Sequence, residues 1–167
     1  SYEEIAGLDI IDYSNEALNK PVKVSGLEVD DGRFTGEMAV DGDLSTRVSF
    51  ERKDDAWFMV DVKDTYWVDK IEIVWNEKPN KYAIYISEDG ENWTKVYEDL
   101  ECVGKSSGTD TIVLDKVVKA RYVKYQQLEM FNCDFGEYSG NFCEFRVWTM
   151  GNKTTTILEK AKDLLSK

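Results

Sequence analysis

The sequence predicts an all-β fold, an antiparallel β-sandwich followed by a short C-terminal helix. Three observations predict it. Apolar and polar residues alternate over short runs, turn-forming residues bound these runs, and no helix-like periodicity separates one run from the next. Strands at this spacing, without intervening helices, are typical of an antiparallel sandwich. The 167 residues are enough for one domain with a core of its own.

The middle of the chain carries the clearest strand patterns. Residues 68–75 alternate, with their isoleucines and Trp75 on one side. An Asp-Gly turn signal joins the next two predicted strands into a hairpin. The strands predicted after 68–75 cover residues 82–87, 93–97, 111–114, 120–125 and 142–148.

The C-terminal end differs from the middle. Thr156 and Glu159 fit a T-x-x-E capping box, and the apolar residues around it and after it share one helical face. Whether this helix packs on its own sandwich or leads into a following module stays open at this point. We divide the chain into an N-terminal extension that packs on the sandwich (1–16), the sandwich (17–151), and a C-terminal helix or linker (152–167).

Composition argues against several classes of function. The 33 acidic and 21 basic residues give a net charge of −12, which disfavours a nucleic-acid partner and adsorption to an anionic membrane. No apolar run reaches the roughly 18 residues that span a bilayer, so we expect no membrane insertion. The chain has no histidine and lacks the commonest general base and zinc ligand. Its carboxylate pairs lie in turns and on polar strand faces, which does not favour an enzyme.

The cysteines do not indicate a metal site. Cys102, Cys133 and Cys143 form no C-x-x-C pair, so we expect no structural zinc. Cys133 and Cys143 could form a disulfide if the loop between them closes back. An odd number of cysteines leaves at least one free thiol in either case.

Six short motifs follow one another in the order of a known family. They are ALNKPVKVSG (17–26), AVDGDLST (39–46), WFMVDV (57–62), YISEDGENW (85–93), ARYV (120–123) and CEFRV (143–147). With these motifs the chain resembles discoidin-type domains (the coagulation factor V/VIII C-terminal domain fold), and most closely the bacterial carbohydrate-binding modules of family 32. The resemblance implies a discoidin-like jelly roll. Two positions differ from the pattern of that family: Val48 stands where the family usually has a Trp, and Val62-Lys63 stands where it usually has Leu-Gly.

The resemblance implies a structural Ca²⁺ ion between the Asp-Gly-Asp turn and the last strand. Its ligands would be the side chains of Asp41 and Glu144, the hydroxyl and carbonyl of Thr46, and carbonyls near Met38, Asp43 and Cys143. Ca²⁺ takes about six to eight oxygen ligands, and carbonyls serve as well as carboxylates. The spacing is not that of an EF-hand. A plain Asx turn without a metal is the alternative.

The resemblance also implies a sugar site in three loops at one end of the sandwich. A sugar offers an apolar C–H face and a rim of hydroxyls, so its site needs an aromatic surface and polar groups. The candidates are Glu28, Asp30 and Arg33 in the first loop, Trp75, Asn76 and Asn80 in the second, and Tyr138, Asn141 and Phe142 in the third. Trp75 is either a stacking surface or the last core residue of its strand. In the third loop we expect Phe142 or Tyr138 to stack on the sugar and Asn141 to bind a hydroxyl.

We therefore expect a non-catalytic carbohydrate-binding module of a larger, secreted bacterial protein such as a glycoside hydrolase. It would target terminal sugars of host glycans, of the N-acetylglucosamine or galactose type. The resemblance implies that galactose-binding relatives use a histidine in the first loop; its absence here, and the absence of arginine from the second loop, weakens the case for galactose. The expected partners are a mono- or oligosaccharide and other modules of the same polypeptide, with the module itself monomeric and extracellular. A lipid- or protein-adhesion module and a silent structural spacer are the alternatives.

Overall fold

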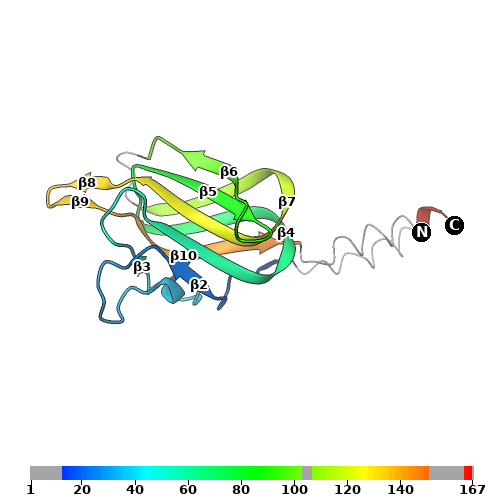
Figure 1. Ribbon diagram of the computed structural model, residues 1–167, viewed down its shortest axis with the longest axis horizontal. Helices are drawn as coiled ribbons and strands as arrows, with labels where there is room; N and C mark the ends of the chain where they lie inside the picture. The colour runs from blue at the N-terminus through cyan, green and yellow to red at the C-terminus, as the bar shows by residue number, and fades with distance from the viewer. Residues whose placement is uncertain (1–12, 103–106, 151–163, 167) are drawn as a thin grey trace.

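The computed structural model describes residues 13–102, 107–150 and 164–166 (Figure 1). Ten strands and one short 3-10 helix form in this part of the chain. They are β1 (Ser14–Asn15), β2 (Val22–Val24), η1 (Gly36–Ala39), β3 (Val48–Ser49), β4 (Trp57–Glu77), β5 (Lys81–Ser87), β6 (Thr94–Asp99), β7 (Gly108–Glu129), β8 (Phe131–Cys133), β9 (Gly136–Tyr138) and β10 (Asn141–Thr149). Most of the predicted C-terminal helix, and residues 1–12 of the predicted extension, lie outside the described residues.

Eight of these strands form one antiparallel sheet that folds into two layers. Their order is β1-β10-β4-β7-β5-β6, with β2 added to β4 and β3 added to β10. β2 pairs with the first half of β4, whereas β10 pairs with its second half. β5 pairs only with the second half of β7. One layer therefore contains β2, β5 and β6 and the other β1, β3 and β10, while β4 and β7 pass through both, which confirms the predicted antiparallel sandwich.

Two long strands run continuously where the sequence predicts breaks. The WFMVDV motif (57–62) and the strand predicted over 68–75 lie in the two halves of β4, and β7 joins the strands predicted over 111–114 and 120–125. A register shift between Asp61 and Tyr66 bends the paired strands from one layer into the other. Lys63, inside this shift, has left-handed backbone with a φ of 72°. The polar residues of the bend interrupt the alternation without ending the strand.

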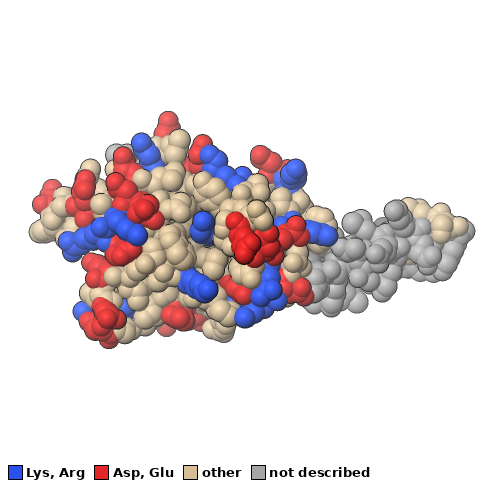
Figure 2. Space-filling view, in the orientation of Figure 1, with Lys and Arg blue, Asp and Glu red and all other residues tan. Residues whose placement is uncertain are grey.

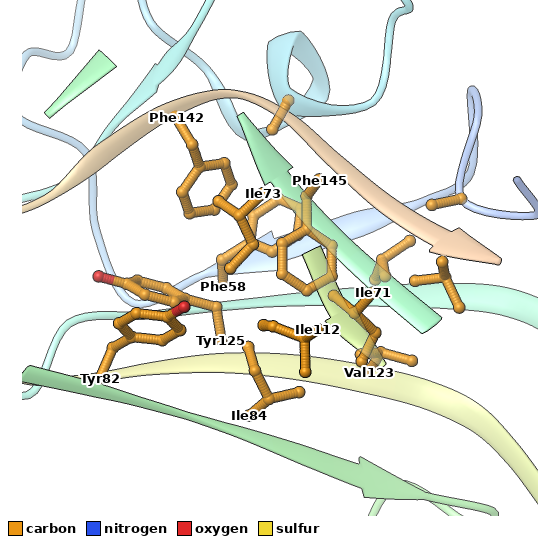
Figure 3. Close-up of a cluster of buried hydrophobic side chains, with 14 of the residues drawn as sticks. Phe58, Ile71, Ile73, Tyr82, Ile84, Ile112, Val123, Tyr125, Phe142 and Phe145 are labelled. Carbon is orange, nitrogen blue, oxygen red and sulfur yellow. The ribbon is translucent and has the colours of Figure 1, made fainter. Parts of the chain in front are cut away.

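An aromatic cluster fills the space between the layers. Phe58, Tyr82, Tyr125, Phe142 and Phe145 are fully buried, and their rings gather between the sheets (Figure 3). The ring centroid of Phe142 lies 5.3 Å from those of Phe58 and Tyr125, in nearly perpendicular contacts that aromatic pairs favour. The alternating isoleucines of β4 face the same core, as their spacing predicts.

The cysteines are free thiols. Cys102 is buried, Cys133 is exposed in β8, and Cys143 is half-buried in β10. The disulfide that the sequence left open between Cys133 and Cys143 is therefore not formed. Within the described residues, no helix has the length and apolar character needed to cross a membrane.

Candidate ligand-binding site at one end of the sandwich

Strand pairing brings distant segments together at one end of the sandwich. Asn141, at the start of β10, lies opposite Ser49 of β3 and opposite Glu77 at the end of β4. The hairpin of β8 and β9 projects from this end, directly before β10 (Figure 1). Side chains from the first loop, the end of β4 and the segment before β10 can therefore meet here.

A pocket of about 350 Å³ opens at this end, within the size range of small-molecule sites. Its walls combine amides, two carboxylates and two guanidinium groups with aromatic rings. The lining residues are Glu28, Arg47, Ser49, Phe50, Arg52, Asn76, Glu77, Phe131, Cys133, Phe135, Tyr138, Ser139 and Asn141. Four of the predicted sugar-binding residues, Glu28, Asn76, Tyr138 and Asn141, are among them.

The hairpin supplies the aromatic surface of the pocket. Phe131 and Tyr138 lie opposite each other on β8 and β9 and stack at a centroid distance of 6.1 Å. The guanidinium of Arg52 lies 4.0 Å from the centroid of the Tyr138 ring. Phe135, in the hairpin turn, is 86% exposed. Because the Tyr138 ring already contacts Phe131 and Arg52, the exposed Phe135 ring is the one most available for stacking on a ligand.

Two amides form the polar centre of the pocket. Asn76 Nδ2 donates a hydrogen bond to Asn141 Oδ1 over 2.7 Å, across the ends of β4 and β10. This bond fixes the two amides relative to each other. It leaves the Asn76 carbonyl oxygen and the Asn141 amide nitrogen to accept and donate hydrogen bonds with a ligand.

A buried glutamine holds the backbone behind the pocket. The Gln127 side chain is fully buried; it donates to the Lys53 carbonyl (2.8 Å) and accepts from the Gly140 N–H (2.7 Å). Gly140 approaches Pro79 so closely that an added Cβ would lie 2.6 Å from the Pro79 Cδ. These contacts order the backbone that presents Asn141, so the pocket is preformed.

Nine of the thirteen lining residues were not among the predicted sugar-binding residues, and the most consequential of these are Arg47, Arg52, Glu77 and Phe135. The two arginines bracket the short strand β3, and this spacing is the signal that could have found them. Phe135 precedes Gly136, which adopts a φ of 122° where the two-residue hairpin turn closes. A hairpin prediction over this loop would have placed Phe135 in its exposed turn.

Two predicted stacking residues belong to the core instead. Trp75 is 3% exposed and Phe142 is completely buried. Their rings contact each other at a centroid distance of 5.7 Å, and the Trp75 Nε1–H donates to Asp110 Oδ2 (3.0 Å). Of the two alternatives for Trp75, the structure shows the last core residue of its strand and not a stacking surface. The expectation that Phe142 stacks on a sugar was wrong, because both side chains point between the layers.

Three further candidates do not line this pocket. Asp30 is exposed in the first loop, and in the same loop Arg33 forms an ion pair with Asp31 (2.7 Å). The Asn80 backbone N–H donates to the Glu129 carbonyl (3.0 Å). The structure thus brings Asp30, Arg33 and Asn80 into neither the amide pair nor the aromatic surface described above.

Behind the pocket, a polar cluster joins β4 to β7. Asp110 accepts hydrogen bonds from the Tyr82 hydroxyl (2.6 Å), the Trp75 indole (3.0 Å) and the Lys78 ammonium (3.0 Å). Burial raises the pKa of Asp110, but these hydrogen bonds outweigh burial and hold it below its ordinary value. Lys78 is itself only 6% exposed. The cluster anchors the strand end that carries Asn76.

An oxygen-rich corner lies at the predicted calcium position. Thr46 Oγ1 lies 2.6 Å from Asp41 Oδ2, 3.0 Å from the Asp43 carbonyl and 3.3 Å from the Met38 carbonyl. One hydroxyl proton cannot serve three acceptors, so the corner has more acceptors than donors. Glu144 is 1% exposed and accepts from the Gly42 N–H (2.7 Å).

The oxygen atoms of this corner are of the types that bind a hard cation. Burial, with the Asp41 carboxyl beside it, raises the pKa of Glu144 to about 7. Carboxylate, hydroxyl and carbonyl oxygens are the ligands that Ca²⁺ prefers. Among the described residues, no group of three or more His, Cys, Asp and Glu side chains could hold a metal, so a shell here would depend on carbonyl oxygens. Cys143, whose carbonyl was predicted as a ligand, precedes Glu144 in β10.

Comparison with known proteins finds similar sequences and folds. Residues 19–141 match the family described as F5/8 type C domain. Polysaccharide lyase 8 family protein HylA of Enterococcus faecalis is 29% identical over 89% of this chain, which spans only 12% of that relative's length. Chitosan-binding module 1 of the chitosanase/glucanase from Paenibacillus sp. IK-5 has a TM-score of 0.67 at 26% identity, over 80% of this chain and 97% of that chain. CpGH89CBM32-5 from Clostridium perfringens, in complex with GalNAc-β-1,3-galactose, has a TM-score of 0.66 at 21% identity, over 83% of this chain and 100% of that chain.

Proposed function

Because the chain belongs to the F5/8 type C domain family, we propose that it is a non-catalytic carbohydrate-binding module whose sugar site is the pocket at the end of the sandwich. The observation that carries the proposal is the union, in one preformed pocket, of the exposed Phe135 ring with the Asn76–Asn141 amide pair. The chitosan-binding module at 26% identity supports a saccharide ligand.

The pocket can bind a sugar through an aromatic surface on one side and polar groups on the other. The Phe135 ring covers an apolar C–H face of the sugar, while the amides of Asn76 and Asn141 and the carboxylate of Glu77 bond its hydroxyls. A shallow contact of this size supports weak binding, with a Kd of roughly millimolar to tens of micromolar. Several modules in one polypeptide would raise the effective affinity.

The proposed setting follows from the relatives. HylA carries its matching segment within a protein of which this chain spans 12%, so we place the module in a larger extracellular carbohydrate-active protein. Its ligands would include terminal N-acetylglucosamine- or galactose-type sugars of host glycans. The module would act as a monomer beside other modules of its polypeptide.

A Ca²⁺ ion would stabilise this module at the oxygen-rich corner. Asp41, Thr46 and Glu144, with the Met38 and Asp43 carbonyls, would hold it. The ion would link the loop before β3 to β10, and a cation that binds only the folded state raises its stability.

The calcium proposal is tested by calorimetric unfolding. We expect added CaCl₂ to raise the melting temperature, EDTA to reverse the rise, and Asp41→Asn to abolish it. Asp64→Asn, at the exposed bend of β4, is the matched control and should keep the full response. A melting temperature that CaCl₂ leaves unchanged would contradict the metal site.

The binding proposal is tested on a glycan array, followed by calorimetric titration of each hit. We expect Phe135→Ala and Asn141→Ala to weaken binding. Tyr13→Ala is the control, because Tyr13 is a partly exposed ring that stacks on Trp148 near the other end of β10. A folded protein that binds no glycan would refute the proposal and favour a structural spacer.

A further inference from the structure

Two guanidinium groups enter the pocket in the same type of arrangement. The Arg52 Cζ lies 4.0 Å from the centroid of the Tyr138 ring, and the Arg47 Cζ lies 4.2 Å from that of Phe34. Stacking on a ring restricts a guanidinium but leaves the N–H groups at its edge available for acceptors. Both arginines are therefore preordered as donors.

Neither guanidinium is hydrogen-bonded to a carboxylate in the part of the chain that the structure describes. Arg47 Nε donates to the neutral Ser49 hydroxyl over 3.3 Å, and no ion pair to Arg47 is found among the described residues. Arg52 forms an ion pair with Glu28, but its 3.8 Å separation is beyond hydrogen-bond length, and both side chains are partly exposed, so the pair is weak. By contrast, Arg121 forms a two-point hydrogen-bonded pair with Asp61, at 2.9 and 3.1 Å.

This lack of close partners is informative because acids outnumber bases in the chain, 33 to 21. Figure 2 shows Lys and Arg atoms interspersed with Asp and Glu atoms over the end from which β8 and β9 project. With so many carboxylates in the chain, two stacked arginines that line one pocket without a hydrogen-bonded carboxylate have donors left for an acceptor from outside.

We propose that the pocket selects saccharides that carry an anionic group, a carboxylate or a sulfate, bound by Arg52 and Arg47. The inference rests on the proposed sugar-binding function and names its ligand class. A planar guanidinium binds such oxyanions through two parallel N–H donors, which favours them over neutral hydroxyls.

The acidic residues of the pocket are compatible with this selection. Glu77 lies opposite Asn141 in the strand register, where it serves the sugar hydroxyls together with the amides. Glu28 is the acidic residue near Arg52, but it stays 3.8 Å away. A ligand anion could approach Arg52 to hydrogen-bond distance. The net charge of −12 is spread over the whole chain, and salt screens its repulsion of an anion beyond about 8 Å at physiological ionic strength. It therefore does not prevent an anion from binding in the pocket.

Matched glycans test the selection directly. The first set is a galacturonate trisaccharide with its neutral methyl ester, and the second is N-acetyllactosamine with its 6-O-sulfate; binding is measured by calorimetric titration. We expect at least one charged member to bind at least about 10-fold more tightly than its neutral partner. Carboxylate preference in the first set and sulfate preference in the second tell the two sources of the anion apart.

The variant Arg52→Gln removes the charge at a side chain that is 54% exposed, so the fold should persist. We expect it to lower the affinity for the charged glycan at least about 10-fold and for its neutral partner no more than about 2-fold. Lys95→Gln is the control: it removes an equal charge from an exposed side chain of β6 that does not line the pocket, and should leave both affinities unchanged.

The outcomes separate this inference from the proposed function. Equal binding of charged and neutral partners, or a charged preference that survives Arg52→Gln, would overturn the anion site while leaving the sugar-binding function intact. Binding of no member of either set, and of no glycan on the array, would overturn both.

Discussion

Alanine at Phe135 should weaken ligand binding without changing stability, whereas alanine at Phe142 should destabilise the fold. Phe135 is 86% exposed and Phe142 is completely buried, although the two rings lie only seven residues apart in the sequence. The same substitution therefore removes a ligand-facing ring in one case and a core ring in the other.

The structure sets the two magnitudes. The Phe142 ring lies within 5.3 to 5.7 Å of five other rings, including Phe50 and Phe145. Removing such a ring costs about 3–5 kcal/mol, a large share of a domain stability of roughly 5–15 kcal/mol. Removing an exposed ring changes stability by less than about 0.5 kcal/mol. If Phe135 contributes a stacking energy of about 0.5–1.5 kcal/mol, its loss weakens binding roughly 2- to 12-fold.

Chemical denaturation and calorimetric titration measure these effects separately. We expect Phe135→Ala to unfold at the wild-type urea midpoint and Phe142→Ala at a much lower one. Phe142→Leu keeps most of the core volume and should bind glycan with wild-type affinity. A folded Phe142→Leu protein that loses binding, together with unchanged binding by Phe135→Ala, would refute this assignment of roles.

Three further perturbations test the framework around the pocket. Lys63→Gly should stabilise the protein by about 0.5–1 kcal/mol, since it relieves left-handed strain, whereas Lys63→Ala should not; urea midpoints compare them. Asp110→Asn should destabilise the protein by up to about 3 kcal/mol at neutral pH, because it leaves Lys78 buried without its closest charge partner. Since the folded pKa of Asp110 is depressed, its contribution is full above the unfolded pKa of about 4 and is lost as the pH falls through the folded pKa, so this variant should show a shallower acid decline in a pH series of melts. Gly140→Ala should clash with Pro79 and cost about 1–3 kcal/mol as well as glycan affinity; equal binding would contradict the preformed loop.

Local patterns in the sequence were enough to predict the sandwich and part of the site. Alternation placed the isoleucines of β4 in the core, because a residue's face in a strand depends only on its register. Asn76 and Asn141 were predictable because they flank strands that pair with each other. The amides at these strand ends consequently meet in the pocket.

The choice among aromatic residues could not be made from local patterns. Phe142 is the second residue of β10, and its burial depends on pairing opposite Trp75 and on the rings that β4 and β7 supply. Phe135 is exposed because β8 and β9 form a hairpin of their own, with Gly136 closing its turn. The two arginines of the pocket flank β3 in the sequence, but their stacking contacts with Phe34 and Tyr138 depend on the fold and could not be predicted from that spacing.

Amide chemical-shift mapping is the most direct measurement of where a saccharide lies on this chain. In a two-dimensional NMR titration of the labelled protein with its best glycan, the largest shifts should fall on Asn76, Phe135, Tyr138 and Asn141, with none near Tyr13. Shifts that leave these four residues unmoved and cluster on another face of the sandwich would contradict the assignment of the pocket.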